Sequence, residues 1–257
     1  MPEPQRISSR DNPLLLRLRK LVHDGAAYRR QGQVWIEGEH LCSALRARGG
    51  TAMQAVITDE AWQDPGLRAL AACADRVAIV SPPLFKALST LESPAALGFL
   101  MALPAAAQID PDAASVVLDR VQDAGNVGSI LRSAAAFGIT QVLALKGTAA
   151  LWAPKVLRAG MGAHFALRLH EGLDASALDA LRLPLVATSS HAGQPLPQAE
   201  LPSPCAWLLG HEGQGMAPAL LQRAVLQVRI PQPGGEESLN VAAAAAVCFY
   251  EAARRLQ

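Results

Sequence analysis

The sequence places polar and basic residues at the start of an expected helix, directly after a buried strand. The apolar run 116–118 is typical of such a strand, and Asn126, Gly128 and Arg132 follow it within a few turns. The first turn of a helix attracts anions, and arginine matches the two-pronged geometry of a phosphate. These residue types therefore predict a site for a phosphate-bearing ligand.

Three kinds of site begin in this way: a phosphate-binding loop, a nicotinamide-nucleotide loop and a nucleic-acid methylation site. A P-loop needs Gly-Lys-Ser/Thr, which occurs nowhere in the chain. A dinucleotide fingerprint needs G-x-G-x-x-G, whereas Gly125 and Gly128 supply only G-x-x-G. Neither common nucleotide loop is present, and the methylation site stays open.

A second cluster, "LLGHEGQGM" at residues 208–216, follows another apolar strand. Its glycines, Gly210, Gly213 and Gly215, let the backbone approach a ligand or another segment closely. Glu212 would lie at the carboxyl end of the strand, where α/β sheets bind their ligands. The alternative is a glycine-rich turn with a solvated glutamate.

A third cluster occupies residues 230–255. A strand ends at Ile230, and either Ser238 or Asn240 can cap the helix that follows. The first turns of this helix, residues 242–246, are all alanine, so the helix can pack very close to a neighbour. The alternative is an ordinary capped amphipathic helix.

The segments around these clusters alternate between strands and helices, which predicts an α/β fold with a parallel sheet. In residues 1–103 we expect a first helix over 13–28, and residues 104–112, rich in Pro, Ala and Asp, are typical of a linker. In residues 113–257 the expected strands are short apolar runs, as in sheets covered on both faces. These runs are 115–121, 141–145, 165–170, 184–190, 206–210 and 226–231.

Composition sets the broad class of protein. The chain has 257 residues, 51% of them hydrophobic, so a sizeable core can form. No apolar run approaches the length of a membrane span, and the first residues contain no hydrophobic signal segment, so we expect a cytoplasmic protein. The four cysteines are scattered without metal-ligand spacing, which favours reduced thiols and no metal site.

Charge is balanced overall but not along the chain. The net charge is +1, while residues 1–30 carry seven Arg or Lys against three acidic residues. Of the 23 basic residues only four are lysines, and arginine is the better match for phosphate. The N-terminal segment therefore either contacts RNA or is simply a solvated helix face.

Together, and in this order, the three clusters closely resemble the SpoU (TrmH-type) RNA ribose methyltransferases of the SPOUT superfamily. The segment "KVLRAGMGAHFALRL" and the "EGEH" region, similar to a small ribosomal-protein-like domain, extend the resemblance over nearly the whole chain. His211 stands where asparagine is frequent in the family, and Glu236 where an apolar residue is frequent. The matching positions are Asn126, Gly128 and Arg132, then Gly210, Glu212, Gly213 and Gly215, then Pro231, Ser238, Leu239 and Asn240.

The resemblance implies an RNA substrate-binding domain over 1–103 and a SPOUT methyltransferase domain with a trefoil knot over 113–257. It implies S-adenosylmethionine as cofactor, RNA (rRNA more than tRNA) as substrate, and a homodimer in which the arginine of one subunit lies near the partner's cofactor. The cofactor contacts it implies are Thr188, Leu209, Gly210, Glu212, Gly213, Ile230, Ser238, Leu239 and Asn240.

The resemblance also implies catalytic roles. Arg132 is the family's catalytic arginine, and we expect a phosphate clamp and oxyanion stabiliser rather than a base, because guanidinium stays protonated. Asn126 would orient the ribose or the arginine, while Glu212 and Ser238 would fix the loops and polarise the nucleotide. The expected catalytic set is Arg132, Asn126, Glu212, Ser238 and Asn240, and the expected RNA contacts are Arg17, Arg19, Arg29 and Arg132.

Two other functions compete with this one. A non-catalytic RNA-binding or ribosome-assembly factor would use the same fold, but the intact Asn126, Arg132, Glu212 and Asn240 argue against it. A nucleotide-dependent oxidoreductase lacks its fingerprint. Binding of S-adenosylmethionine and not NADH would separate these alternatives.

Overall fold

A computed structural model describes residues 3–190, 192–235 and 238–256. The chain folds into two compact units. The first runs to Ala105 and includes Trp152–Leu157, while the second consists of Ala106–Leu151 and the described residues from Arg158 onward. Within the described part of the chain, no helix has both the length and the apolar character that crossing a membrane requires.

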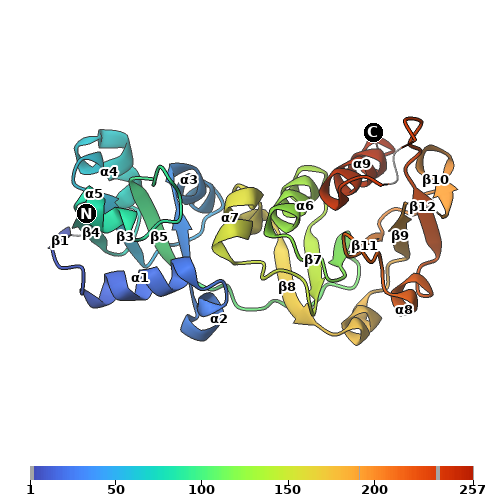
Figure 1. The fold of residues 1–257 in the computed structure, drawn as a ribbon, viewed down its shortest axis with the longest axis horizontal. Helices are drawn as coiled ribbons and strands as arrows, with labels where there is room; N and C mark the ends of the chain where they lie inside the picture. The colour runs from blue at the N-terminus through green and yellow to red at the C-terminus, as the bar shows by residue number, and fades with distance from the viewer. Residues whose placement is uncertain (1–2, 191, 236–237, 257) are drawn as a thin grey trace. The chain divides into compact units, whose positions relative to one another are not determined.

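The first unit is a mixed sheet packed against helices (Figure 1). Its strands are β1 (Gln5–Ile7), β2 (Gln33–Glu37), β3 (Gln54–Thr58), β4 (Val77–Val80) and β5 (Leu97–Ala102). They lie in the order β1-β4-β3-β5-β2, and β5 runs antiparallel to both neighbours. The helical segments are α1 (Pro13–His23), α2 (Ala27–Gln31), α3 (Glu39–Ala47), η1 (Ala61–Gln63), α4 (Pro65–Ala71) and α5 (Pro82–Lys86).

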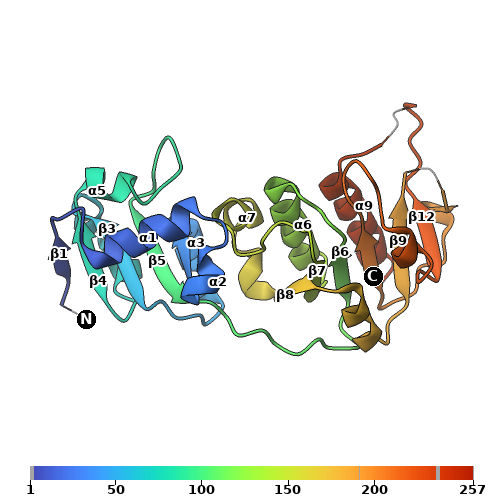
Figure 2. The same ribbon diagram turned by 60° about the horizontal axis from the view of Figure 1, so that its bottom comes forward.

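Helix α1 lies along the first sheet (Figure 2) and is shorter than expected. It begins as predicted, because the side chain of Asn12 accepts a hydrogen bond from the backbone N–H of Leu14 over 2.9 Å. The expectation of one helix to residue 28 is wrong. Asp24 ends the helix because its carboxylate accepts from the N–H of Ala26, a local turn that competes with helical hydrogen bonding.

The second unit is built on an all-parallel sheet, which confirms the predicted α/β class. Its strands are β6 (Ser115–Leu118), β7 (Gln141–Leu145), β8 (Arg168–Leu173), β9 (Leu185–Ser189), β10 (Gln194–Pro195), β11 (Ala206–Leu209) and β12 (Leu226–Arg229). They lie in the order β10-β12-β9-β11-β6-β7-β8. Strand order alone does not reveal how the chain is threaded, so the trefoil knot stays a prediction.

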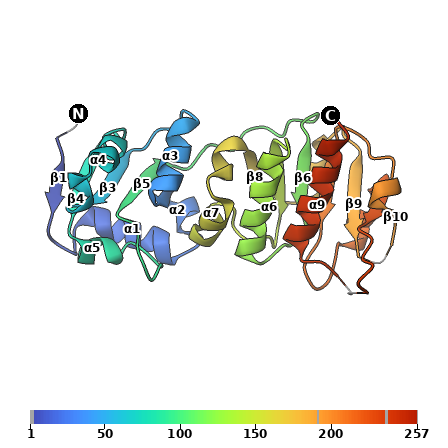
Figure 3. The same ribbon diagram turned by 90° about the horizontal axis from the view of Figure 1, so that it is seen from above.

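Helices cover both faces of this sheet. They are α6 (Ala124–Ala136), η2 (Ala163–Ala166), η3 (Ala175–Ala180), η4 (Leu196–Gln198), α8 (Pro218–Leu221) and α9 (Val241–Arg254). Helix α7 (Pro154–Gly160) begins within the segment that belongs to the first unit. Figures 1 and 3 show α6 and α9 side by side on one face, where Ala242 and Ala245 of α9 are buried. Trp207 of β11 and Phe249 of α9 pack with their ring centroids 6.3 Å apart. Val117, Leu208 and Leu220 belong to the core.

Covering both faces explains the strand sequences. All four residues of β6 and all four of β11 are buried, so each strand reads as a continuous apolar run rather than an alternating one. This burial also fixes the register of β6 and β11, so that Leu118 and Leu209 lie side by side at the carboxyl ends of the two strands. The loops that leave these ends therefore start side by side.

Candidate functional site

The three predicted clusters come together at the carboxyl edge of the second sheet. The segment 119–126 follows β6, the loop 210–217 follows β11, and the segment 230–240 follows β12. Strands β6 and β11 are neighbours, and β9 lies between β11 and β12. Ligands of parallel α/β sheets bind at this edge, so the topology puts the clusters where a site is expected.

Asn126 connects all three clusters through its side-chain amide. Its Nδ2 donates to Oε1 of Glu212 over 3.1 Å, and its Oδ1 accepts from Nδ2 of Asn240 over 2.9 Å. These two contacts require the same orientation of the Asn126 amide, because its nitrogen meets an acceptor and its oxygen meets a donor. We call this arrangement the Asn126 bridge.

Glu212 is held by backbone as well as by Asn126. Its carboxylate accepts from the N–H of Asp123 over 3.2 Å and from the N–H of Gln122 over 3.3 Å. Burial raises the pKa of Glu212, but these hydrogen bonds to the charged form outweigh it and the pKa lies below its ordinary value. The carboxylate is therefore ionised at neutral pH and fixes the loop 210–217 against the start of α6.

Two helix N-termini converge on the Asn126 bridge. Asp123 caps α6 by accepting from the N–H of Asn126 over 2.7 Å. Asn240, rather than Ser238, caps α9, because its Oδ1 accepts from the N–H groups of Ala242 and Ala243. The positive ends of two helix dipoles thus face one region, where the carboxylates of Asp123 and Glu212 already lie.

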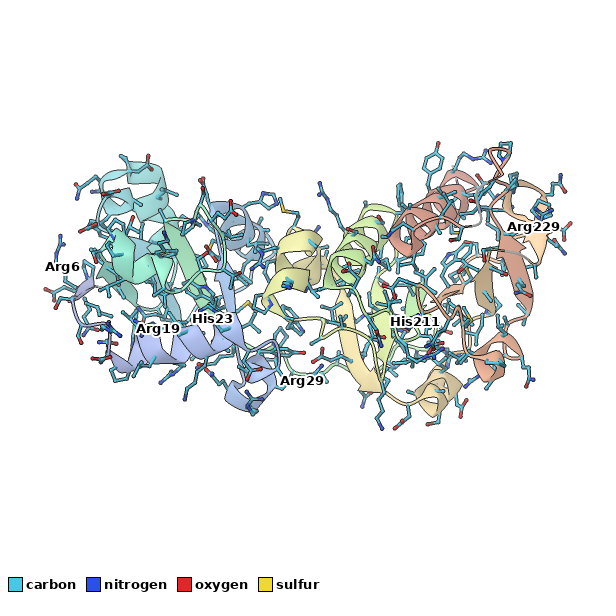
Figure 4. The ribbon with its side chains drawn as sticks, in the orientation of Figure 1. Arg6, Arg19, His23, Arg29, His211 and Arg229 are labelled. Atoms are coloured by element: carbon cyan, nitrogen blue, oxygen red, sulfur yellow. The ribbon has the colours of Figure 1, made fainter. Side chains whose placement is uncertain are left out.

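The loop 210–217 depends on close backbone contact and on one histidine. A Cβ atom added at Gly210 would lie 2.5 Å from the backbone nitrogen of Met216, so only glycine fits there. His211, labelled in Figure 4, accepts at Nδ1 from the N–H of Gly213 over 2.9 Å and from that of Gln214 over 3.1 Å. An asparagine Oδ1 forms the same local turn, so this departure from the family preserves the loop geometry.

The remaining predicted catalytic residues, Arg132 and Ser238, take no part in the Asn126 bridge. Arg132 is exposed on α6, and its side chain forms no ion pair or hydrogen bond with any other described residue. Ser238 is exposed just before Asn240, and Glu236 lies outside the described residues. The structure therefore joins Asn126, Glu212 and Asn240 directly and leaves the side chains of Arg132 and Ser238 available to a ligand.

The other residues expected to hold the cofactor differ in what they expose. Ser238 and Leu239 form no backbone hydrogen bond with other described residues, so their N–H and C=O groups are available to the edge of an adenine. Leu239, 40% exposed, offers an apolar surface. Thr188 donates its hydroxyl to the carbonyl of Leu208 over 3.1 Å. Leu209 is buried and Ile230 is half-buried, so they can contribute mainly backbone.

The predicted RNA contacts in the first unit differ in environment. Figure 4 shows Arg19 on α1 and Arg29 on α2. Arg19 has a buried Nε, and the guanidinium carbon of Arg29 lies 5.2 Å from the centroid of the Tyr28 ring. Arg17 instead lines a groove of about 910 Å³, which we call the basic groove. Its walls are Pro13, Leu16, Arg17, Lys20, Asp24, Arg30, Gln31 and Gln33.

Sequence reasoning missed three residues that hold the site together. Asp123 caps α6, and Asp119 and Arg120 contact the loop 210–217. Asp119 could have been found, because an acidic residue directly after a buried parallel strand lies at the ligand edge of the sheet. For Arg120, the residue type alone did not predict a contact with the loop 210–217.

Comparisons with known proteins give a matching family model and several relatives. A model of the SpoU rRNA Methylase family matches residues 113–250. A Synechocystis protein described as an uncharacterized tRNA/rRNA methyltransferase is 33% identical, over 97% of this chain and 93% of its own. A 23S rRNA guanosine 2′-O-methyltransferase of Bacillus subtilis is 30% identical, over 84% of this chain and 86% of its own. A crystal structure of an RNA 2′-O ribose methyltransferase is 34% identical, with a TM-score of 0.83 over 98% of this chain and 100% of its own.

Proposed function

Because this chain belongs to the SpoU rRNA methylase family, we propose that it transfers the methyl group of S-adenosylmethionine to a ribose 2′-hydroxyl of a structured RNA. Ribosomal RNA is the preferred substrate over transfer RNA, since the Bacillus subtilis relative carries the name of a 23S rRNA methyltransferase. We propose further that it acts in the cytoplasm, as expected for a protein similar to this bacterial relative.

One observation supports this proposal above the others, namely the Asn126 bridge. It links the three sequence clusters through side chains, with Asn126 bonded to Glu212 on one side and to Asn240 on the other. Capping a helix would not by itself require Asn240 to bond to Asn126, nor Asn126 to bond to Glu212 as well. The bridge thus supports a site built for a ligand rather than a set of unrelated turns.

The proposed reaction requires the protein to align the substrate and to favour loss of a proton. S-adenosylmethionine, when bound, supplies a methyl carbon activated by its sulfonium. The chain would align the 2′-hydroxyl with that carbon and favour loss of the hydroxyl proton, so that the O–C bond forms as the S–C bond breaks and S-adenosylhomocysteine leaves. Arg132 suits this task as a cation that clamps the neighbouring phosphate and stabilises charge at the 2′-oxygen, because its guanidinium is exposed and unpaired among the described residues.

The cofactor would be held by the loops after β9, β11 and β12. We assign adenine and ribose to the backbone near Leu209, Gly210, Ile230 and Leu239, with Thr188 and Gly213 alongside. Glu212, Ser238 and Asn240 would fix the loops and polarise the nucleotide. A knotted C-terminal segment is part of this proposal, and the close approach at Gly210 is compatible with it.

RNA capture is assigned to the first unit. We propose that residues 1–103 form the RNA-binding domain, 104–112 the linker and 113–257 the methyltransferase domain. The basic groove carries Arg17 and Lys20, and its Arg30 pairs with Asp24. Arg17 and Lys20 therefore present uncompensated charge to a phosphate backbone. Arg19 is less accessible because its Nε is buried, and the guanidinium of Arg29 lies over the ring of Tyr28.

A homodimer is also part of the proposal. Helix α9 carries an exposed apolar stripe at i, i+4 and i+7, formed by Ala243, Val247 and Tyr250. Val247 and Tyr250 are 41% and 54% exposed, which is unusual for large apolar side chains in a row. Pairing of two such stripes would cover them and bring Arg132, on the neighbouring helix α6, toward a second subunit.

The test is a methylation assay on unmodified rRNA and tRNA, with 2′-O-methyl nucleosides detected by mass spectrometry of nuclease digests. We expect methylation that requires S-adenosylmethionine, and calorimetric binding of that cofactor but not of NADH. Mapping 2′-O-methylation across all transcripts in cells with and without the gene would identify the nucleotide. Cofactor binding with no methylated RNA in either experiment would favour a non-catalytic RNA-binding factor.

A further inference from the structure

Arg120 adopts a backbone conformation that its side chain normally disfavours. Its φ is +56°, in the left-handed region where a long side chain costs free energy and glycine does not. Residues held there persist only when surrounding contacts determine the conformation, and such residues cluster at functional sites. The contacts of Arg120 should therefore show what holds this conformation in place.

The guanidinium of Arg120 connects the end of β6 with the loop 210–217. Its Nε and Nη2 donate to the two carboxylate oxygens of Asp119 over 3.0 and 3.1 Å. Its Nη1 donates to Oε1 of Gln214 over 3.1 Å, and its Nη2 also lies 3.4 Å from the carbonyl of Gly215. A fork with fixed geometry thus holds two consecutive loop residues at once.

Asp119 completes this connection from the same strand end. Its side chain is 7% exposed, and its Oδ2 accepts from the N–H of Ala217 over 2.8 Å. The carboxylate is compensated by Arg120 and holds the far end of the loop. Glu212, held by Gln122 and Asp123, fixes the near end. The loop is therefore tied at both ends to the segment 119–126.

Gly147 makes room for this arrangement. It has a φ of +91°, and a Cβ added there would lie 2.9 Å from Cγ of Arg120. The backbone of the neighbouring loop thus contacts the arginine stem and limits where the guanidinium can go. The strained backbone, the close glycine and the occupied fork all act on one side chain.

We propose that Arg120 is a positioning residue that shapes the loop 210–217 for S-adenosylmethionine, acting through Asp119, Gln214 and Gly215 without touching the reacting atoms. This inference rests on the proposed function. It differs from a purely structural role, in which Arg120 would only occupy a turn. In that case any residue that tolerates a positive φ would serve equally well.

Two substitutions separate these roles, because they remove the same guanidinium but differ in backbone strain. Arg120→Ala keeps the unfavourable φ, and Arg120→Gly relieves it, so the glycine variant unfolds at the higher temperature of the two. If Arg120 positions the loop, both variants bind S-adenosylmethionine about tenfold or more weakly in calorimetry. Arg120→Lys recovers part of the affinity. Arg182→Ala, which removes an exposed arginine paired with Asp112, is the matched control and leaves affinity unchanged.

Hydrogen exchange of the ligand-free protein gives a readout that does not depend on the cofactor. Both Arg120 variants should lose protection at the amides of 214–217, while Arg182→Ala keeps it. If wild type binds no S-adenosylmethionine, the proposed function fails, and retained protection in the variants would overturn the loop role separately. The proposal is also overturned if Arg120→Gly restores wild-type affinity, or if protection falls while affinity stays the same.

Discussion

Asn126 and Asn240 hydrogen-bond through their side chains over 2.9 Å although 114 residues separate them in the sequence. Each also serves the N-terminus of its own helix, since Asn240 caps α9 and the N–H of Asn126 receives the cap of α6. The contact therefore couples the placement of two helix starts. Changing either amide alters the ligand edge as a whole.

Replacing Asn126 by aspartate tests this coupling. Asn126→Asp puts a carboxylate where an amide donor now reaches Glu212, so two like charges face each other at about 3 Å and the pKa of Glu212 rises. We expect S-adenosylmethionine affinity to fall by roughly tenfold or more. Calorimetry at neutral pH measures it. Ser129→Asp adds the same charge to an exposed position of α6 and should leave the affinity near wild type.

Arg132 tests the proposed chemistry. Arg132→Ala should cost about 3 kcal/mol or more in the transition state, a rate loss of roughly a hundredfold or greater in single-turnover methylation. Arg132→Lys should recover only part of the rate, because an ammonium lacks the two-pronged geometry. Cofactor affinity should hardly change. Near-normal activity of Arg132→Ala would refute the assignment.

The basic groove makes a prediction about RNA binding. Arg17→Gln and Lys20→Gln should each weaken binding of rRNA fragments and lower the slope of log affinity against log salt by about one for each phosphate that the protein no longer neutralises. Filter binding at several salt concentrations measures this slope. Arg68→Gln, an exposed arginine of α4 outside the groove, is the control. Equal weakening by all three variants would contradict a specific role for the groove.

The apolar stripe of α9 predicts the oligomeric state. Val247→Glu places a charge within the stripe, so light scattering should show a shift from dimer to monomer, with methylation lost alongside. Val225→Glu changes another exposed valine, 70% exposed and outside the stripe, and should leave the dimer intact. If the wild-type protein is monomeric at all concentrations, the proposed active site shared between two subunits is wrong.

A buried histidine gives a prediction about pH. Burial lowers the pKa of His164 from 6.5 to about 4, and its Nε2 lies 2.8 Å from the carbonyl of Leu151. Because the folded pKa is below the unfolded one, the neutral ring stabilises the fold fully above pH 6.5. This contribution is lost as the pH falls from 6.5 toward 4.

The measurement is denaturant unfolding of wild type and His164→Gln at pH 7.5 and pH 5. Between these values wild type should lose about 2 kcal/mol more stability than the variant, from about 1.4 kcal/mol per pKa unit. His23→Gln alters an exposed histidine and should follow wild type. Equal pH dependence of wild type and His164→Gln would show that the ring titrates normally.

The central strands β6, β7 and β11 of the second sheet were predictable because they are almost entirely apolar. The runs beginning at Ser115, Gln141 and Ala206 start as expected, since burial on both faces leaves a strong signal. The prediction of a strand over 165–170 was wrong at its start, because residues 163–166 form a 3₁₀ turn and β8 begins at Arg168. The turn is held in part by buried His164, which contacts the carbonyl of Leu151. Local hydrophobicity alone could not predict this contact.

The site was predictable in its members but not in its contacts. Asparagine, glutamate and glycine at the ends of strands indicate a ligand edge, whereas the partner of each amide depends on which loops meet. The positive φ of Arg120 could not be predicted, since it arises from Asp119, Gln214 and Gly147 acting together. Of the two candidate caps for α9, only geometry selects Asn240.

The strand order of the second unit bears on how a nascent chain acquires its ligand site. Strands β6, β7 and β8 are neighbours in sequence and in the sheet, so they can pair while the rest is still being translated. Glu212 reaches Asn126 only after 86 further residues, and Asn240 only after 114. A ribosome stalled between these points carries a partly formed sheet whose ligand edge is still open. The ligand edge can therefore close only after Asn240 has been synthesised and is free to fold against Asn126.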